Sequence, residues 1–506
     1  MKVLFATSEA HPLIKTGGLA DVSGSLPKAL KALKNQVRII LPAYRAVLDK
    51  VADKSPKHIA RVEVGGCGRH YQADVLEVKA KSFPSLGVPI WLVDIPELFD
   101  RPGNPYLAQD GTDWWDNGER FAVFSKVVAE IAMGRVGVKW QPDVVHTNDW
   151  QTGLVNALLS LEQDRPRTVF TIHNMAYPGN YPESLFAQLE LPWSLWHMNG
   201  VEFWGHFSML KSGLIYADRI TTVSPTYAKE ICLNEYAYGF EGILQERSQK
   251  GHLIGILNGI DDQVWNPEVD EFIAHQYSVE KGRVSAKKKN KAKLLEEFSI
   301  LNHVSEEEVS ANFDRWLEAP LFGFVGRLVW QKGVDVVLEA LPNLLKHTDA
   351  NFIFVGSGEK YFEEKLMEYS QHYPKRIWTY IGYSEKLGHE VEAGADMFLM
   401  PSRFEPCGLN QLYSLAYGTP PIVNFTGGLA DSVIPATSEN LANHLATGFV
   451  FYEPAAYAFE EAVHSALALF AKKRTWQKLQ KIGMQQSFDW RNSAQQYLKV
   501  YQGEES

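Results

Sequence analysis

The sequence Thr16-Gly17-Gly18-Leu19-Ala20-Asp21 near the start of the chain returns unchanged as Thr426-Gly427-Gly428-Leu429-Ala430-Asp431 near its end. Each copy follows an apolar, strand-like run, at residues 3–6 and at residues 421–425. α/β proteins bind ligands in the turns after their strands, and paired glycines let backbone N–H groups approach groups such as phosphates. The repeat predicts an α/β protein of two halves whose glycine turns hold one ligand between them. Either copy alone is as consistent with an ordinary helix-start turn.

Apolar runs and helical segments alternate in both halves of the chain. In the first half, strands are expected at 3–6, 37–41, 91–95, 143–147, 168–173 and 219–223, with helices at 26–33, 119–133 and 153–161. In the second half, strands are expected at 321–325, 351–355, 377–381, 397–401, 421–425 and 448–452. This alternation predicts two doubly wound domains, each a mostly parallel sheet covered by helices.

A change in composition separates the two halves. Between Asn258 and Pro320 the chain becomes polar and lysine-rich, and it includes the run Lys287-Lys288-Lys289-Asn290-Lys291. By position we expect this stretch to mark the crossing between the domains, and we favour lysines on a solvated helix over a nucleic-acid patch. A last helical stretch at 494–501 follows a break and forms a separate element. The predicted division is 1–258, 259–486 and 487–506.

The overall composition narrows the class of protein. With 506 residues, 45% of them hydrophobic, the chain can bury a large core and is too long for one ordinary domain. A net charge of −10 argues against general binding to nucleic acids or anionic membranes. The three cysteines lie far apart without metal-ligand spacing, and no apolar stretch approaches the length of a membrane span. We expect a soluble, cytoplasmic protein without a nucleic-acid or membrane partner.

The stretch Gly326-Arg327-Leu328-Val329-Trp330-Gln331-Lys332-Gly333 joins a predicted strand to a helix. An arginine and a lysine five positions apart in such a loop can both reach one diphosphate, the first as a planar fork and the second as a point charge. The stretch lacks the Walker pattern, and no G-x-G-x-x-G follows the first strand, so simple nucleotide hydrolysis and nicotinamide binding are disfavoured. A solvated loop with routine basic residues is the alternative interpretation.

The stretch from Pro401 to Gln411 also runs from a strand end into a helix. Pro406, placed in the first helical turn, would leave free backbone N–H groups where an anion is stabilised by ~0.3–2 kcal/mol. A ligand whose hydroxyls meet Glu405 while its phosphates meet the helix end would use both features. A sugar nucleotide has that shape, although Glu405 could instead be a structural charge at the helix N-terminus.

In the first half, polar residues close two of the expected strands and flank the first glycine turn. His173-Asn174 and Asp149 follow strands, and Lys15 comes directly before the first glycine pair, with Asp21 close by. The spacings of His, Asp and Glu match no metal-ligand motif. We therefore expect no bound metal, because the two cations of the 326–333 loop can neutralise a phosphate without one.

Together these stretches resemble the family of bacterial glycogen synthases and plant starch synthases, which are retaining glucosyltransferases. The resemblance covers essentially the whole chain, and its specificity lies in the order of the motifs. It implies a GT-B architecture, in which two Rossmann-like domains face a central cleft and the C-terminal helix crosses back to the first domain. The matching motifs are KTGGLADV (15–22), DW (149–150), HN (173–174), NGID (258–261), GRL (326–328), QKG (331–333), SRFEPCGL (402–409) and TGGLAD (426–431).

The resemblance implies transfer of glucose from ADP-glucose to the non-reducing-end 4-hydroxyl of an α-1,4-glucan, with retention of configuration and without a cofactor. Arg327 and Lys332 would stabilise the departing diphosphate, Glu405 would hold the donor glucose, and His173 would lie near the anomeric carbon. The family has no well-placed carboxylate nucleophile, so departure and attack on the same face are expected. Tyr383 would stack on adenine. Residues assigned to substrate binding by the resemblance are Lys15, Gly18, Asp21, Asp149, Asn174, Asn258, Tyr383, Cys407, Gly408, Leu409, Asn410, Thr426 and Gly427.

The chain departs from the family pattern at a few positions. Asn410 stands where threonine is usual, Asn148 and Gln151 replace common histidines, and Asn424-Phe425 stand where an arginine often occurs. These changes leave open UDP-glucose as the donor and the handling of the acceptor. The rival interpretations are another GT-B enzyme such as a phosphorylase or epimerase, although no lysine context for pyridoxal phosphate is found, and a glucan-binding protein without activity, which the retained Arg327, Lys332 and Glu405 disfavour.

Overall fold

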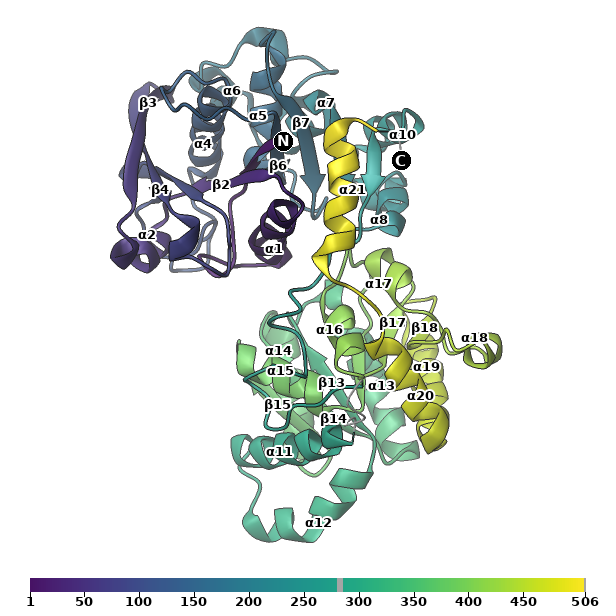
Figure 1. The fold of residues 1–506 in the computed structure, drawn as a ribbon. Coiled ribbons are helices and arrows are strands. Elements are labelled where there is room, and N and C mark those ends of the chain that lie inside the picture. The colour runs from purple at the N-terminus through teal and green to yellow at the C-terminus, as the bar shows by residue number, and fades with distance from the viewer. Residues whose placement is uncertain (280–284, 505–506) are drawn as a thin grey trace. The chain divides into compact units, whose positions relative to one another are not determined.

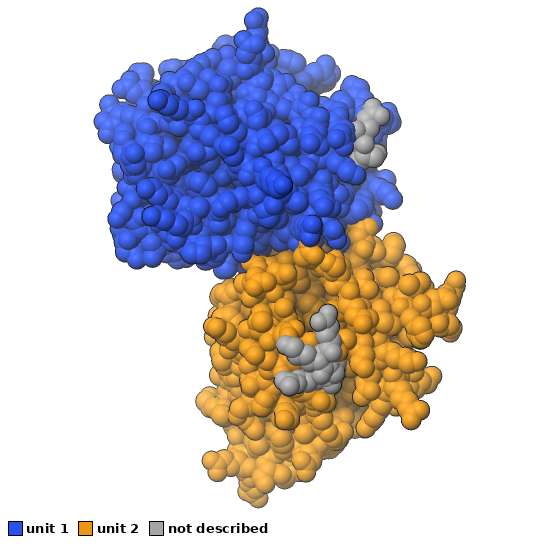
Figure 2. Space-filling model, in the orientation of Figure 1, with its two compact units in different colours: residues 1–259, 490–506 blue, residues 260–489 orange. Residues whose placement is uncertain are grey.

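The computed structural model describes residues 1–279 and 285–504. Its chain forms two compact units, coloured separately in Figure 2: unit 1 is Met1–Gly259 with Trp490–Ser506, and unit 2 is Ile260–Asp489. The boundaries expected from the sequence stand one residue earlier at the first crossing and three residues earlier at the second. Residues 280–284, within the predicted crossing, lie outside the described residues.

Unit 1 is built on a sheet of nine strands in the order β12-β11-β7-β6-β1-β2-β5-β4-β3. Several of these strands, among them β2, β6 and β7, are labelled in Figure 1. The strands from β12 to β5 are parallel, and each strand expected in this half is confirmed. The edge hairpin β3–β4 is antiparallel and was not expected. The bounds are β1 Lys2–Ala6, β2 Gln36–Pro42, β3 Lys57–Gly66, β4 Arg69–Val78, β5 Ile90–Asp94, β6 Val144–Asn148, β7 Arg167–Ile172, β11 Arg219–Thr222 and β12 Leu253–Gly255.

The central strand β1 lies between β2 and β6, and Val3 to Ala6 are fully buried. A parallel strand covered on both faces has a continuous apolar sequence, which is why this strand could be predicted from residues 3–6. A second, small sheet, β8-β10-β9, also belongs to unit 1. Further elements of this unit are α1 Gly18–Ala32, α2 Arg45–Val51, α3 Pro96–Phe99, α4 Asn117–Ala132, α5 Trp150–Ser160, β8 Asn180–Pro182, α6 Glu183–Gln188, β9 Glu202–Phe203, β10 His206–Ser208, α7 Met209–Tyr216, α8 Pro225–Glu230, α9 Asn234–Ala237 and α10 Glu241–Gln249.

The last helix, α21 (Trp490–Gln502), completes unit 1 rather than unit 2. It packs against α1 and β7 and is drawn in yellow in Figure 1. Tyr497 and Tyr501 are buried in the core of the unit. The hydroxyl of Tyr501 lies 2.6 Å from Nδ1 of His146 on β6, and Nε2 of the same ring lies 2.6 Å from Thr171 Oγ1 on β7. The chain's end is therefore joined to the centre of the first sheet.

Unit 2 contains a six-stranded parallel sheet in the order β15-β14-β13-β16-β17-β18, and each strand expected in this half is confirmed. None of the helices in the described ranges is long and apolar enough to cross a membrane. The strands are β13 Leu321–Val325, β14 Asn351–Gly356, β15 Ile377–Ile381, β16 Met397–Met400, β17 Pro421–Asn424 and β18 Phe449–Phe451. The helices are α11 Ala286–Leu301, α12 Glu306–Glu318, α13 Val334–His347, α14 Lys360–His372, α15 Glu385–Gly394, α16 Asn410–Ala416, α17 Gly427–Ser432, α18 Ser438–Ala442, α19 Ala456–Phe470 and α20 Lys473–Met484.

The lysine-rich stretch corrects one expectation. Lys287 and Lys291 on α11 are buried, so the predicted solvated helix is wrong for these two positions. Lys287 Nζ donates to the carbonyls of Glu392 and Ala393 at 3.0 Å, and Lys291 Nζ lies 2.6 Å from Asp396 Oδ2. Residues four apart share a helix face, and this face of α11 packs against α15 and its neighbours within unit 2. The described part of this stretch is thus a component of unit 2, and the crossing itself is short.

Candidate functional site

The predicted site residues lie mostly just beyond the carboxyl ends of neighbouring parallel strands. In unit 1 these strands are β1, β6 and β7, and in unit 2 they are β13, β16 and β17. This is the edge at which open α/β sheets bind ligands. Each unit therefore presents its own group of candidate residues, and the two groups are described separately.

The first glycine turn is held by a buried carboxylate. Glu9 accepts hydrogen bonds from the Thr16 hydroxyl at 2.6 Å, from the Tyr106 hydroxyl at 2.5 Å and from the backbone N–H of Thr16. A Cβ on Gly17 or Gly18 would meet no described atom within 4 Å, so this turn has room for a ligand. Glu9 and Tyr106 are functional candidates that the sequence reasoning did not assign. Tyr106 could not be assigned from the sequence, because it lies in a loop 97 positions after Glu9 and stands in no motif near the glycine turn.

Lys15 and Asp21 flank this turn and pair with each other, Nζ to Oδ1, at 2.8 Å. Their side chains are 34% and 21% exposed. A partly exposed ion pair of this kind contributes little stability, ~0–1 kcal/mol, so a charged ligand can compete for either partner. The structure thus brings both predicted binding residues to the same side of α1, next to Gly18.

Asp149, His173 and Asn174 come together after β6 and β7. Asp149 has an unusual positive φ of 53°, and its Oδ1 accepts the N–H of His173 at 2.7 Å. Burial raises the pKa of Asp149 to about 7, against the opposing effect of the N–H groups of His173 and Asn174. Burial also lowers the pKa of His173 to about 3, so its ring is neutral. The Asn174 side chain accepts the N–H of Ala176 at 3.0 Å.

The raised pKa of Asp149 predicts a pH-dependent stability. The folded protein holds a proton at this carboxyl from about pH 4 to about pH 7 that the unfolded chain releases, so the group's contribution falls as pH rises through that window. Relative to Asp149→Asn, the wild-type melting temperature is expected to fall by at least ~2 °C between about pH 5 and about pH 8. The exposed Asp164→Asn serves as the matched control. A constant difference between wild type and Asp149→Asn across pH would contradict the raised pKa.

In unit 2, the loop after β13 carries the predicted cations. Gly333, with φ of 70°, closes the loop, and a Cβ there would lie 2.1 Å from the Pro401 carbonyl. Only glycine fits this close approach, which presses the loop against the segment after β16. Arg327 is exposed, and its Nη2 lies 3.4 Å from the side-chain oxygen of Gln331. Its guanidinium is thus accessible at the sheet edge.

Lys332 and Glu405 form an ion pair across these two loops. Lys332 Nζ lies 2.5 Å from Glu405 Oε2, and the Ser402 hydroxyl donates to the same oxygen at 3.0 Å. The side chains are 22% and 9% exposed, respectively. Two of the residues predicted to carry chemistry are therefore in direct contact, and the carboxylate is held by two partners in one orientation.

The second glycine turn differs from the first in its surroundings. The N–H of Gly428 donates to the Glu405 carbonyl at 3.1 Å. A Cβ on Gly427, which has φ of 44°, would lie 2.0 Å from that carbonyl oxygen. Thr426 is buried. The identical hexapeptides thus have different environments, because the first turn is open while the second packs against the backbone of Glu405. A binding role for Thr426 and Gly427 stays a prediction.

The helix after Glu405 begins later than expected. α16 starts at Asn410, so Pro406 lies before the helix and the prediction that it occupies the first helical turn is wrong. Gly408, with φ of 71°, redirects the chain ahead of the helix. Asn410 Nδ2 donates to the Val325 carbonyl at 2.7 Å, which commits one of its amide donors to β13. Gln411, which was not predicted, donates to the carbonyls of Cys407 and Gly408 and so orders this loop.

The remaining predicted residues lie at the margins of these groups. Cys407 and Asn258 are buried, whereas Tyr383 is 75% exposed in the loop after β15. Leu409 is the residue before α16. Their positions are compatible with binding and do not test it.

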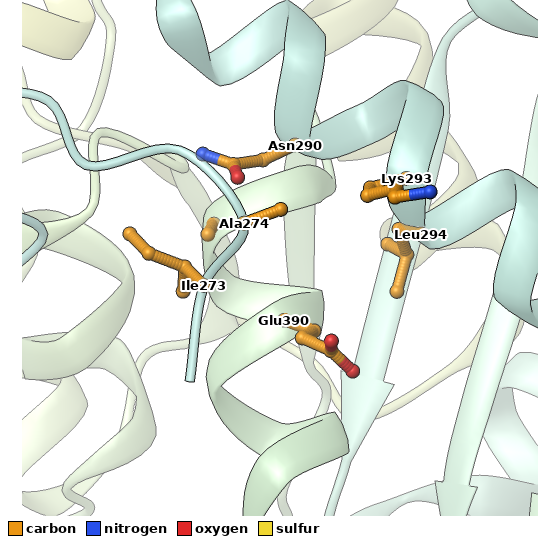
Figure 3. Close-up of a pocket in the computed structure, with 7 residues that line it drawn as sticks. Ile273, Ala274, Asn290, Lys293, Leu294 and Glu390 are labelled. Carbon is orange, nitrogen blue, oxygen red and sulfur yellow. The ribbon is translucent and has the colours of Figure 1, made fainter. Parts of the chain in front are cut away.

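Metal-binding side-chain groups and cavities are further places at which a ligand could bind. Within residues 1–279 and 285–504, no group of three or more His, Cys, Asp and Glu side chains is placed to hold a metal ion. A cavity of about 10 Å³ between α11 and α15 has room for a single water molecule (Figure 3). It is a packing gap within unit 2, lined by Ile273, Ala274, Asn290, Lys293, Leu294, Glu390 and Ala393.

Comparison with known proteins gives the same picture for both units. Residues 2–246 match the model of the starch synthase catalytic domain, and residues 305–480 match that of glycosyl transferases group 1. The chain is 60% identical to a glycogen synthase of Hydrogenovibrio crunogenus and 46% identical to one of Thioalkalivibrio sulfidiphilus, with 99% of each chain covered in both cases.

Among solved structures, the catalytic domain of starch synthase IV from Arabidopsis thaliana, bound to ADP and acarbose, superposes with a TM-score of 0.83 at 29% identity. The match covers 99% of this chain and 98% of that one. A sucrose-phosphate synthase from Thermosynechococcus elongatus, at 18% identity and a TM-score of 0.56, shares the fold alone. The two parallel α/β units therefore have the GT-B fold, and the chain belongs to the glycogen and starch synthase family of glycosyltransferases.

Proposed function

We propose that this enzyme transfers glucose from ADP-glucose to the non-reducing end of an α-1,4-glucan, with retention of configuration. The observation that carries the proposal is the Lys332–Glu405 pair at the carboxyl edge of the unit 2 sheet, in a chain that matches glycogen synthases over its full length. ADP bound to the related starch synthase IV supports an adenosine nucleotide. A nucleotide-sugar donor and three cysteines without disulfide bonds support a cytoplasmic location.

The proposed chemistry divides between charge and positioning. Arg327 and Lys332 supply positive charge for the departing diphosphate, and Glu405 accepts hydrogen bonds from the donor glucose. In this proposal His173 of unit 1 lies near the anomeric carbon, and Asp149 of the same unit binds the substrate. In this proposal no carboxylate acts as a nucleophile, so departure and attack occur on one face of the sugar through an oxocarbenium-like state.

We further propose that no metal ion takes part in the transfer. The charges of Arg327 and Lys332 provide the leaving-group stabilisation that a divalent cation gives other transferases. Full activity is expected in excess EDTA, measured as ADP release with glycogen as the acceptor. Loss of activity on chelation and its recovery on adding magnesium would overturn this part of the proposal.

A direct assay tests the donor and the reaction together. The protein is incubated with glycogen and either ADP-glucose or UDP-glucose, and nucleotide release and chain growth are both measured. ADP-glucose is expected to give a kcat/KM at least about tenfold higher, which corresponds to ~1.4 kcal/mol of discrimination. A preference for UDP-glucose would support the alternative donor. Binding of glycogen without release of either nucleotide would indicate a glucan-binding protein without activity.

A further inference from the structure

Asn148, the last residue of β6, has a fully buried side chain that reaches two neighbouring strands. Its Nδ2 donates to the Ala6 carbonyl at the end of β1 at 3.0 Å, and its Oδ1 lies 2.9 Å from Nε2 of His173 beyond β7. The backbone at Asn148 is fixed as well, because its N–H donates to the Thr152 hydroxyl at 2.6 Å. Hydrogen bonds therefore fix the side-chain nitrogen, the side-chain oxygen and the backbone N–H of Asn148.

These contacts decide which way the amide faces. A carbonyl oxygen can only accept a hydrogen bond, so the atom of Asn148 next to Ala6 must be the nitrogen. The atom next to His173 is then the oxygen, which can only accept. Nε2 of His173 must therefore carry the proton, and in the neutral ring Nδ1 is left with a lone pair.

We infer that Asn148 is a positioning residue that locks His173 as its neutral Nε2–H tautomer, so that Nδ1 is the acceptor the ring offers to a hydroxyl of the sugar substrate. The use of this acceptor rests on the proposed glucosyl transfer, whereas the tautomer lock is a property of the protein alone. Asparagine does not titrate, so the lock holds wherever the protein is folded. A neutral histidine at position 148 could accept from Nε2 only through the one ring nitrogen that carries no proton, whereas the amide oxygen can only accept.

The surroundings of the His173 ring keep it neutral. Burial dominates its environment and lowers its pKa to about 3. The titratable groups nearby are His146 on β6, which is likewise buried and neutral, and Asp149, whose side-chain oxygen Oδ1 accepts the backbone N–H of His173 rather than a ring proton. Glu9 interacts with Asp149 and raises its pKa. The ring therefore makes its tautomer-determining contact with an uncharged amide.

The first test uses the unaltered protein without substrate. In protein labelled with ¹⁵N-histidine, the His173 signals are assigned by their absence from His173→Gln. The expected spectrum shows a protonated Nε2 and an unprotonated Nδ1, unchanged from about pH 5 to about pH 8. A proton on Nδ1, or a titration of His173 within that range, would overturn the inference whatever the enzyme's activity proves to be.

The second test asks whether the lock matters for transfer. In Asn148→Ala, His173 is expected to populate both tautomers and kcat/KM to fall by about 5- to 100-fold, because Nε2–H loses its buried acceptor. Asn148→His is expected to restore the Nε2–H form only in part, because a neutral imidazole accepts through just one of its two ring nitrogens. Asn156→Ala is the matched control, since Asn156 is also buried but bonds Thr147 and Gly153 instead.

The control variant is expected to keep the wild-type tautomer and to change kcat/KM by less than about twofold. A loss of activity in Asn148→Ala with an unchanged tautomer would show a merely structural role and overturn the inference. If the wild-type protein has the expected tautomer but transfers glucose from neither nucleotide sugar, the proposed function fails. In that case the role of Nδ1 in substrate binding fails with it, and the lock itself stands.

Discussion

Replacing Glu405 by alanine is expected to lower kcat for glucosyl transfer by about 100- to 1,000-fold while the fold stays intact. The carboxylate is almost buried and is oriented by Lys332 and Ser402, so it is available to the donor sugar in a single geometry. Groups positioned in this way stabilise the transition state more than the ground state, and their loss appears mainly in kcat. The measurement is nucleotide release under saturating donor and glycogen.

Two companion variants sharpen this experiment. Glu405→Gln keeps the shape of the side chain and removes its charge, so it separates hydrogen bonding from electrostatics. Glu339→Ala removes an exposed carboxylate from α13 in the same unit and is expected to leave kcat unchanged. A Glu405→Ala enzyme with undiminished kcat and a normal melting temperature would remove this residue from the site.

Replacing Lys332 by alanine is expected to reduce kcat/KM for the donor by about 100-fold. The ammonium group lies at the sheet edge beside Glu405, where its charge can stabilise a departing diphosphate. The variant also leaves the Glu405 carboxylate without its cation, which adds the cost of an unpaired, nearly buried charge. Both effects act in the same direction, so this is the second-largest change we expect.

Lys332→Arg and Lys346→Ala complete the series. The arginine variant keeps the charge but not the compact ammonium, so only partial recovery is expected. Lys346 is an exposed lysine in the last turn of α13 and controls for loss of surface charge. Equal ADP release by Lys332→Ala and the parent enzyme, each at a donor concentration below its KM, would contradict the proposed role of this lysine.

Most parallel strands of both units were predictable because they are short, largely buried runs rich in apolar and β-branched residues, whereas the short edge strand β12 was not expected. β13 and β15 match their expected bounds of 321–325 and 377–381 residue for residue. The β3–β4 hairpin was missed although its buried and exposed residues alternate. Its turn contains Cys67-Gly68, both with positive φ, and cysteine is not among the residues that signal such a turn.

The site was predictable to the extent that it follows from strand ends. Glu405 and Lys332 follow adjacent strands, and their assignment to one donor came from the resemblance to the synthase family. The contacts that hold the first glycine turn were not predictable, because they join side chains from distant segments. Tyr106 bonds Glu9 although 97 positions separate them, and the start of α16 was misplaced because Gly408 turns the chain first.

The position of α21 has a consequence for how the protein is made. A ribosome delivers unit 2 complete once Asp489 has emerged, but the first-synthesised unit still lacks the helix that buries Tyr497 and Tyr501 in its core. Until then the nascent first unit exposes the surfaces of α1 and β7 that α21 covers, and His146 has no tyrosine hydroxyl to bond. Domains generally fold in the order of their synthesis. Here the order is reversed at the last step, so that the half begun first is the half finished last.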